Sequence, residues 1–352
     1  MNHKVRALFI LKLRQDYGNI MEHQQVPSGM LNSAKFIADM LISSGHDAEV
    51  ITVIDNNFID REVRARKPTH VFIEGYWVVP EKFPILKRLH PHVKWIVRCH
   101  SEMPFLAQEG IALDWTFNYW KDGIAVAGNS PRICSELKVM ARESGVGSEE
   151  KIGHLVPLLP NYYPCCEHFS HDPNESDNYI NIGCFGAIRP LKNQLIQAIA
   201  AIEFANHHKK KLRFHVNQGR IELYGQNPVK NLRALFFHAK DHTLAEHDWM
   251  GHEEFMRIIT KMDMCMQVSF SETFNIVTAD AVNVGCPVVA SKEITWLHPI
   301  WADPTSSQDI FEKMNIIYTD RENYCISNKT HLRNFSIGSK HRWLEYLNRA
   351  VG

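Results

Sequence analysis

Short apolar segments of strand length alternate along this chain with longer segments in which apolar residues recur at helical spacing. This order is typical of a parallel β-sheet whose strands are joined by helices. In the first half it predicts a helix at residues 30–42, with Ser28 as the N-cap and Gly45 as the stop. The strands predicted in that half are residues 5–11, 49–54, 70–73, 95–98, 124–127 and 152–159.

A polar stretch with several prolines interrupts the alternation between residues 159 and 178, and the pattern then starts again. The strands predicted in the second half are residues 180–185, 212–216, 264–268 and 287–290, and the helices are residues 193–206, 229–237, 253–262 and 278–284. A last amphipathic helix is predicted at residues 340–350.

The chain has 352 residues, too many for one compact core, so we expect an α/β protein with two Rossmann-like domains and a cleft between them. We place the first domain at residues 1–163 and the second at residues 164–335. Residues 336–352 are expected to form a helix that packs back on the first domain.

Composition restricts the setting in which the chain works. Lys and Arg together number 39, as do Asp and Glu, so no net field draws the protein toward nucleic acid or an anionic membrane. No apolar stretch approaches the roughly 18 residues needed to span a bilayer. The eight cysteines include no Cys-x-x-Cys pair, which is typical of reduced thiols. We expect a cytoplasmic protein without integral membrane association.

Several motifs of nucleotide, hydrolase and metal sites are absent. The chain has no Gly-x-x-x-x-Gly-Lys-Ser/Thr, Gly-x-Gly-x-x-Gly or Gly-x-Ser-x-Gly. It also lacks the Asp-x-Asp pair on which a metal-bridged diphosphate site often relies. His238 and His242 lie four residues apart but without the glutamate of a zincin motif, so we expect no metal and no cofactor.

The segment from Asn181 to Gln194 carries two cations, Arg189 and Lys192, where a predicted strand ends at glycines and a helix begins. Glycines such as Gly186 let a ligand approach the backbone, a helix N-terminus favours negative charge, and the cations add charge-assisted hydrogen bonds. These features predict a diphosphate site that needs no metal. The alternative is a plain strand-to-helix turn with exposed basic side chains.

The segment from Ser269 to Ala290 carries Glu272 in the loop after a predicted strand, and Asp280 about two turns into the next helix. Ligands of α/β folds bind at the carboxyl ends of strands, and carboxylates accept hydrogen bonds from sugar and ribose hydroxyls. The segment therefore predicts a sugar site. The alternatives are a charge favoured by the helix dipole for Glu272 and a solvated helix residue for Asp280.

In this order and about eighty residues apart, the two segments resemble the nucleotide-sugar half of the retaining GT-B glycosyltransferases of the group 1 family. Gly186, Arg189 and Lys192 match the family's diphosphate motif, with one residue fewer between the cations than in many members. Glu272 and Asp280 match its Glu-x7-Glu motif, with Asp in place of the second Glu. The resemblance implies the GT-B fold.

The resemblance also implies roles for these residues. Glu272 contacts the hydroxyls of the donor sugar, Asp280 binds the nucleotide ribose, and the cations stabilise the departing diphosphate. Transfer then retains the anomeric configuration and needs no metal. Backbone amides that face the sugar and phosphates are implied for three residues: Phe274, Asn275 and Ile276.

The match is looser in the first half. His100 follows the fourth predicted strand, where the family often carries an active-site histidine that reaches the transferred sugar. The alternative is an ordinary loop histidine. The family's glycine pair after the first strand has two candidates here, Gly18 and Gly29, and spacing does not choose between them.

The resemblance implies a hexosyl- or pentosyltransferase that moves a sugar from a nucleotide-diphosphate donor, expected to be UDP-linked, to an acceptor hydroxyl. Aromatic-rich segments at residues 72–77 and 114–120 are similar to those of phage-encoded glycosyltransferases. The acceptor predicted on that basis is a hydroxymethylated pyrimidine in phage DNA, in the host cytoplasm. The alternatives are a glycan or small-molecule acceptor, a sugar-nucleotide binding protein without turnover, and an enzyme like the UDP-sugar 2-epimerases.

Overall fold

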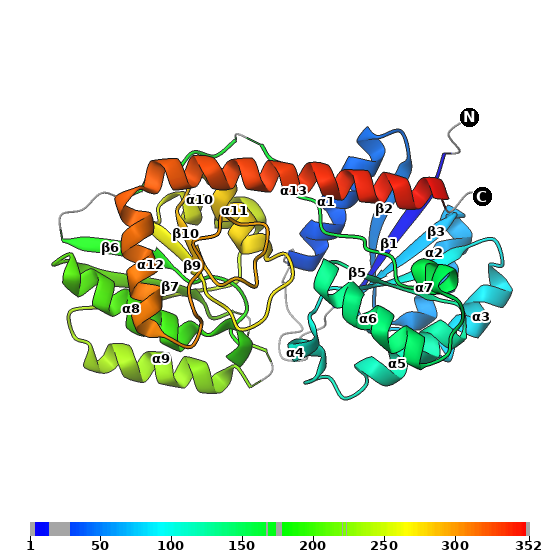
Figure 1. Cartoon of the computed structure of the whole chain (residues 1–352), viewed down its shortest axis with the longest axis horizontal. Helices are drawn as coiled ribbons and strands as arrows, with labels where there is room; N and C mark the ends of the chain where they lie inside the picture. Colours follow the sequence, from blue (N-terminus) through cyan, green and yellow to red (C-terminus); the bar gives the residue numbers. More distant parts are fainter. Residues whose placement is uncertain are drawn as a thin grey trace. The chain divides into compact units, whose positions relative to one another are not determined.

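The computed structural model describes residues 4–13, 29–166, 168–173, 178–219, 221–222 and 224–349. Contacts along the chain divide it into two compact units (Figure 1). Among the described residues, unit 1 comprises 4–13, 29–164 and 336–349, and unit 2 comprises the remainder, from Cys165 to Phe335. Ser28 and Gly18 lie outside the described residues.

Unit 1 is built on a parallel sheet in the order β2-β1-β3-β4-β5. Its strands are β1 (Arg6–Lys12), β2 (Asp47–Val53), β3 (His70–Glu74), β4 (Lys94–Cys99) and β5 (Ala125–Gly128). Its helices are α1 (Gly29–Ser43), η1 (Asn56–Phe58), α2 (Ile59–Arg66), α3 (Lys82–Leu89), α4 (Met103–Leu106), α5 (Ala112–Lys121), α6 (Pro131–Glu143) and α7 (Glu149–Leu155). The chain passes from β1 to β2 on one side and returns to β3 on the other, so the strand order reverses between β1 and β3.

Strands β1, β3, β4 and β5 are buried on both faces, and alternate residues supply two hydrophobic clusters. Leu8 and Ile10 of β1 belong to the cluster that includes residues of α2, α3, α5 and α6. Phe9 faces the other way, and its ring stacks on Phe72 of β3 at a centroid distance of 4.9 Å. This second cluster also contains α1 and Trp343 from the end of the chain.

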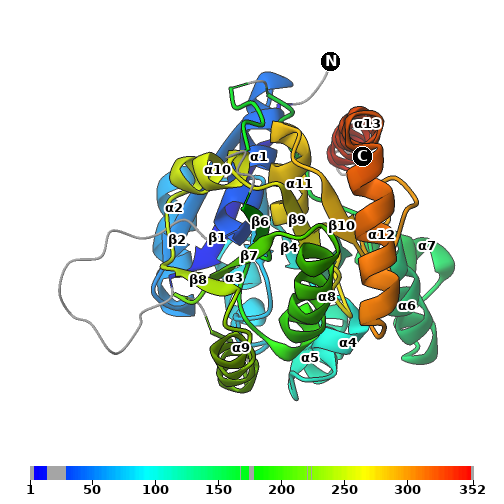
Figure 2. The ribbon, with the colours of Figure 1, turned by 90° about the vertical axis from the view of Figure 1, so that its left-hand side faces the viewer.

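Unit 2 is built on a parallel sheet in the order β10-β9-β6-β7-β8. Its strands are β6 (Tyr179–Gly183), β7 (Lys211–Asn217), β8 (Thr243–His247), β9 (Met264–Gln267) and β10 (Val288–Ala290). Its helices are η2 (Pro190–Lys192), α8 (Gln194–His207), α9 (Gln226–His238), α10 (His252–Thr260), α11 (Ile276–Val284) and α12 (Ser307–Thr319). Helices α8 and α12 cover one face of the sheet and α10 and α11 the other (Figure 2). The strand order reverses between β6 and β9.

The last helix, α13 (Arg321–Arg349), is 29 residues long, far longer than the helix predicted at residues 340–350 (Figure 1). Its residues up to Phe335 belong to unit 2 and those from Ser336 onward to unit 1. Polar side chains interrupt the buried stripe of the helix, which explains why hydrophobic periodicity revealed only its end. That stripe consists of Tyr324, Asn328, Leu332, Ser336, Ser339, Trp343 and Leu347.

The strand predicted at residues 152–159 is wrong, because the first half of this segment, residues 152–155, lies in helix α7. Ser148 caps the helix by accepting a hydrogen bond from the backbone N–H of Lys151 at 3.4 Å, and Glu149 and Glu150 favour its first turn. Only Leu158 makes a bridge, to Gly128 at the end of β5. None of the described helices combines the length and apolar character that a membrane crossing requires.

Candidate functional site

The loops that follow β6 and β9 meet where the strand order of unit 2 reverses. The backbone N–H of Phe270 donates to the carbonyl of Leu191 at 2.9 Å, and the side chain of Asn193 donates to the carbonyl of Val268 at 3.0 Å. In return, the side chain of Gln197 accepts from the N–H of Val268 at 2.8 Å. These bonds fasten residues 191–197 to residues 268–270. In open α/β sheets this position is the usual place for a ligand.

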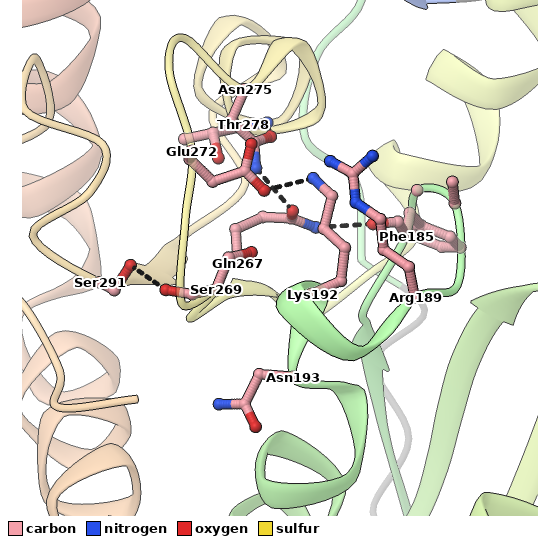
Figure 3. Close-up of polar contacts among 12 residues, drawn as sticks. Phe185, Arg189, Lys192, Asn193, Gln267, Ser269, Glu272, Asn275, Thr278 and Ser291 are labelled. Atoms are coloured by element: carbon pink, nitrogen blue, oxygen red, sulfur yellow. Dashed lines mark hydrogen bonds and ion pairs between the residues drawn. The ribbon is translucent and has the colours of Figure 1, made fainter. Parts of the chain in front are cut away.

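Gln267, at the end of β9, connects the same two loops beneath the charged residues (Figure 3). Its amide donates to the carbonyl of Phe185 at 2.9 Å and accepts from the side chain of Asn275 at 2.8 Å. Asn275 adopts a left-handed conformation, with φ of 57°, which asparagine tolerates better than most residues. Its side chain also caps α11 by accepting from the N–H of Thr278 at 2.9 Å. The loop that carries Glu272 is therefore held at both ends.

The ammonium group of Lys192 donates to a carboxylate oxygen of Glu272, so the two predicted segments meet in one ion pair (Figure 3). The side chains are only 12% and 7% exposed. In surroundings with little water, such a pair interacts more strongly than one at the surface. Glu272 lies four residues before α11 begins, so its partner is Lys192 and not simply the dipole of that helix.

Arg189 lies three residues before Lys192, and its side chain extends toward the same side of the loop (Figure 3). Its Nη1 atom is 3.4 Å from a carboxylate oxygen of Glu222, and both side chains are largely buried. Each cation of the motif therefore faces a carboxylate of its own. Sequence reasoning missed Glu222, which follows a short bridge between Ile188 and Ile221.

Gly186 is required by backbone conformation and not by lack of space. Its φ is +109°, and a Cβ atom built there would meet nothing closer than Val277 Cγ2 at 3.9 Å. Its N–H donates to the side chain of Asn217 at 2.9 Å. The turn that leads from β6 to Arg189 and Lys192 thus depends on the positive φ of Gly186 and on its hydrogen bond to Asn217, the last residue of β7.

Asp280 lies about one turn into α11, not two, and it is buried, so a solvated helix residue is the wrong description. Its carboxylate accepts a hydrogen bond of 2.8 Å from Nε2 of His252, the first residue of α10. This hydrogen bond raises the pKa of His252, and burial opposes the shift. The Asp280 side chain is 2% exposed and that of His252 is 29% exposed. Sequence reasoning missed His252, since nothing local marks a histidine as the partner of a residue 28 positions away.

Phe274 and Ile276 flank Asn275 and have different surroundings. The ring of Phe274 is buried against Phe335 at a centroid distance of 5.1 Å, and its carbonyl accepts from the indole of Trp296 at 2.8 Å. Ile276 is the first residue of α11, so its N–H belongs to the four that find no partner within the helix. The backbone N–H of Ile276, unlike that of Phe274, therefore lies at a helix N-terminus, which is a place where anions bind.

His100 lies in unit 1, directly after β4, where it contacts a buried carboxylate. Its Nε2 atom is 2.6 Å from Oε2 of Glu74, the last residue of β3. Arg98 binds the same carboxylate, with its Nη1 atom 3.0 and 2.9 Å from the two oxygens. His100 is therefore a loop residue whose ring is held by a buried carboxylate. Gly29 is also in unit 1, as the first residue of α1.

No protein-family model and no curated protein match the chain. Solved structures match almost all of it. Sucrose-phosphate synthase from Thermosynechococcus elongatus is 12% identical, with a TM-score of 0.66 over 98% of this chain and 99% of that chain. The catalytic domain of starch synthase IV from Arabidopsis thaliana, bound to ADP and acarbose, is 11% identical, with a TM-score of 0.67 over 99% and 100%. HepE from Anabaena, in complex with UDP and glucose, is 15% identical, with a TM-score of 0.61 over 99% and 98%.

These matches confirm the predicted fold class. The chain is an α/β protein with two parallel-sheet domains, the fold of the GT-B glycosyltransferases.

Proposed function

We propose that this protein is a glycosyltransferase whose unit 2 binds a nucleoside-diphosphate sugar. The observation that carries the proposal is the ion pair between Lys192 and Glu272, which joins a diphosphate-type loop to a sugar-type carboxylate where the strand order reverses. A donor of this class offers both partners: phosphate oxygens accept hydrogen bonds from Lys192, and sugar hydroxyls donate to Glu272.

The diphosphate is assigned to Arg189 and Lys192. Each charge-assisted hydrogen bond contributes about 1.5–3 kcal/mol. As the bond between the anomeric carbon and the diphosphate breaks, negative charge grows on the leaving group, and both cations stabilise it. The acceptor oxygen forms the new bond to that carbon on the same face, and its proton passes to a phosphate oxygen of the leaving group. This course retains the anomeric configuration.

The nucleoside is assigned to Asp280 together with His252. The Asp280 carboxylate is almost fully buried and already holds His252, so the more exposed imidazole is the group that meets the ribose hydroxyls. UDP is the proposed nucleotide, supported by the HepE structures with UDP-glucose and with UDP and glucose. ADP is the second choice, on the basis of the starch synthase complex.

The acceptor proposed remains a hydroxymethylated pyrimidine in DNA, with a glycan or small molecule as the alternative. Residues 1–163 contain 19 Lys and Arg and 18 Asp and Glu, so they present little net positive charge for a polyanion. Binding of duplex DNA, measured across salt concentrations, decides between these acceptors. An affinity that does not depend on salt, or no binding at all, removes DNA.

A mass-spectrometric screen of nucleotide sugars tests the function itself. UDP-, ADP- and GDP-linked hexoses and UDP-linked pentoses are incubated with the full chain, and binding, slow hydrolysis and transfer are recorded. We expect one donor to bind and to release its nucleotide slowly, and the double variant Arg189→Ala/Lys192→Ala to lose this activity by at least about 100-fold. Lys230→Ala, on the exposed surface of α9, is the matched control.

Three results would contradict the proposal or point elsewhere. Full activity in the double variant would remove the cations from the site. Binding of a nucleotide sugar without hydrolysis or transfer to any acceptor would favour a sugar-nucleotide binding protein. Release of nucleotide together with an isomerised free sugar would favour an enzyme like the UDP-sugar 2-epimerases.

A further inference from the structure

A buried ion pair lies directly behind His100 in unit 1. The guanidinium of Arg98 donates to both carboxylate oxygens of Glu74, and neither side chain is exposed to solvent at all. Glu74 ends β3 and Arg98 belongs to the neighbouring strand β4, so the pair crosses the sheet at its carboxyl edge. This is the edge at which open α/β sheets bind ligands.

The pair is oriented by further contacts of Arg98. Arg98 also donates through Nη2 to the carbonyl of Leu159 at 3.2 Å and to the side chain of Asn161 at 3.0 Å. Its guanidinium lies over the ring of Trp343, 5.1 Å from the centroid. These contacts fix the position of Arg98, and Arg98 in turn fixes the carboxylate of Glu74.

Stability alone does not account for such a pair. Burying two charges costs several kcal/mol per ion, and replacing a buried ion pair with apolar residues of the same size is often neutral or stabilising. Ionisable groups that burial and a charged partner perturb cluster at functional sites. Within the described part of unit 1, the partly exposed group that Glu74 contacts is the side chain of His100, which is 13% exposed.

The carboxylate decides which ring nitrogen of His100 carries the proton. Burial raises the pKa of Glu74, but the charges of Arg98 and His100 outweigh burial and leave the pKa lowered. An ionised carboxylate can only accept hydrogen bonds. The contact of 2.6 Å between Nε2 and Oε2 therefore requires the proton on Nε2, and in the neutral ring Nδ1 then carries the lone pair.

We propose that Glu74 is a positioning residue that holds His100 as the Nε2–H tautomer, so that Nδ1 accepts a hydrogen bond from a hydroxyl of the transferred sugar. The role toward sugar rests on the proposed function, whereas the tautomer does not. If a proton reaches Nδ1 during the reaction, Glu74 stabilises the imidazolium that forms. In serine proteases, replacing the carboxylate that orients the histidine leaves the wrong tautomer and lowers turnover by about 10⁴-fold.

Nuclear magnetic resonance of the full chain, with ¹⁵N-labelled histidine, tests the tautomer directly. The signals of His100 are assigned by their loss in His100→Gln. We expect the wild-type protein to show the Nε2–H pattern at pH 8. Glu74→Gln, whose amide can donate to Nε2, is expected to shift His100 toward the Nδ1–H tautomer.

Activity and a matched variant complete the test. Glu74→Gln should lower kcat by at least about 100-fold while the KM for the nucleotide sugar stays within about twofold, and Glu74→Asp should recover part of the loss. Glu102→Gln is the control, because Glu102 is another buried glutamate of unit 1, bound to Ser130 at 2.5 Å. It should leave the His100 spectrum unchanged. Should Glu74→Gln fail to fold, Glu74→Gln/Arg98→Met removes both charges and is measured in its place.

Two results would overturn the proposal: an Nδ1–H pattern in the wild-type protein, or native kcat in a folded Glu74 variant whose tautomer has changed. A wild-type protein that transfers no sugar would instead overturn the proposed function. The spectrum of His100 would still decide whether Glu74 sets its tautomer.

Discussion

Lys192 and Glu272 are 80 positions apart in the chain, yet the ammonium of one donates to the carboxylate of the other. The two groups proposed to bind the phosphates and the sugar are therefore each other's partners before any donor arrives. A donor must displace Glu272 from Lys192 or share the ammonium group with it. Removing either charge should therefore change how tightly the donor binds.

Glu272→Gln should change nucleotide binding and transfer in opposite directions. Without the carboxylate, Lys192 no longer exchanges a partner when a diphosphate binds, so UDP should bind about tenfold more tightly, which corresponds to about 1.4 kcal/mol. Transfer should fall by about 100-fold or more, since the sugar loses its acceptor of hydrogen bonds. Calorimetry with UDP and chromatography of the products measure the two effects. Weaker UDP binding together with normal transfer would show that Glu272 serves the fold and not the donor.

His252→Ala should reduce the preference for ribose. If the imidazole held by Asp280 meets a ribose hydroxyl, the wild-type protein should bind UDP about 10- to 100-fold more tightly than 2′-deoxy-UDP, and the variant should bind both about equally. Asp280→Asn, which removes the charge that holds His252, should act in the same direction. The two dissociation constants, measured by calorimetry, check this. A preference that survives both substitutions would place the ribose elsewhere.

Asn275 combines a left-handed backbone with two side-chain hydrogen bonds, and two substitutions separate these contributions. Asn275→Ala loses both bonds and keeps the strained conformation, so the free energy of unfolding should fall by about 2–3 kcal/mol. Asn275→Gly also loses the bonds but adopts this conformation readily, and it should cost about 1 kcal/mol less. Urea unfolding of unit 2 measures both. Equal losses would mean that the backbone conformation carries no strain.

Acid should destabilise unit 2 through His215. Burial, together with the nearby charges of His247 and Arg213, lowers the pKa of His215 to about 4 in the folded protein, whereas an unfolded chain has a histidine pKa of about 6.5. Between these values the unfolded state binds a proton that the folded state does not, so stability is lost as the pH falls from 6.5 toward 4. At pH 5 the loss from this group is about 2 kcal/mol.

His215→Gln isolates that contribution. The drop in unfolding free energy between pH 7.5 and pH 5 should be smaller in this variant than in the wild-type protein by about 2 kcal/mol. His154→Gln, an exposed position on α7, is the control and should leave the drop unchanged. Identical pH dependence in all three proteins would show that His215 titrates normally in the fold.

The two-sheet fold could be predicted from the sequence because most of its strands are buried on both faces and stand out as apolar runs. Strand β8 and helix α7 are among the elements that escaped this reasoning. Strand β8 lies at the edge of its sheet and consists of Thr-Leu-Ala-Glu-His, with no apolar run to reveal it. Helix α7 carries apolar residues close enough together to resemble a strand, and only its cap at Ser148 distinguishes it.

The charged residues of the candidate site were found for a different reason. Arg189, Lys192 and Glu272 occur in short motifs, so their types and spacing are visible locally. Their partners are not, because Glu222 and His252 come from other elements and only the fold brings them close. Glu74 was missed in the same way, as one more residue of an apolar strand.

Trp343 and Leu347 complete a hydrophobic cluster of unit 1, although they are among the last residues of the chain. The indole of Trp343 also donates to the carbonyl of Pro160 at 2.8 Å. During synthesis, chains usually fold from the N-terminal domain onward. Here unit 1 must wait for the ribosome to release the last turns of α13, whereas the described residues of unit 2 all precede those turns in the chain. Nascent chains stalled shortly before residue 343 should therefore resist protease in their second half before their first.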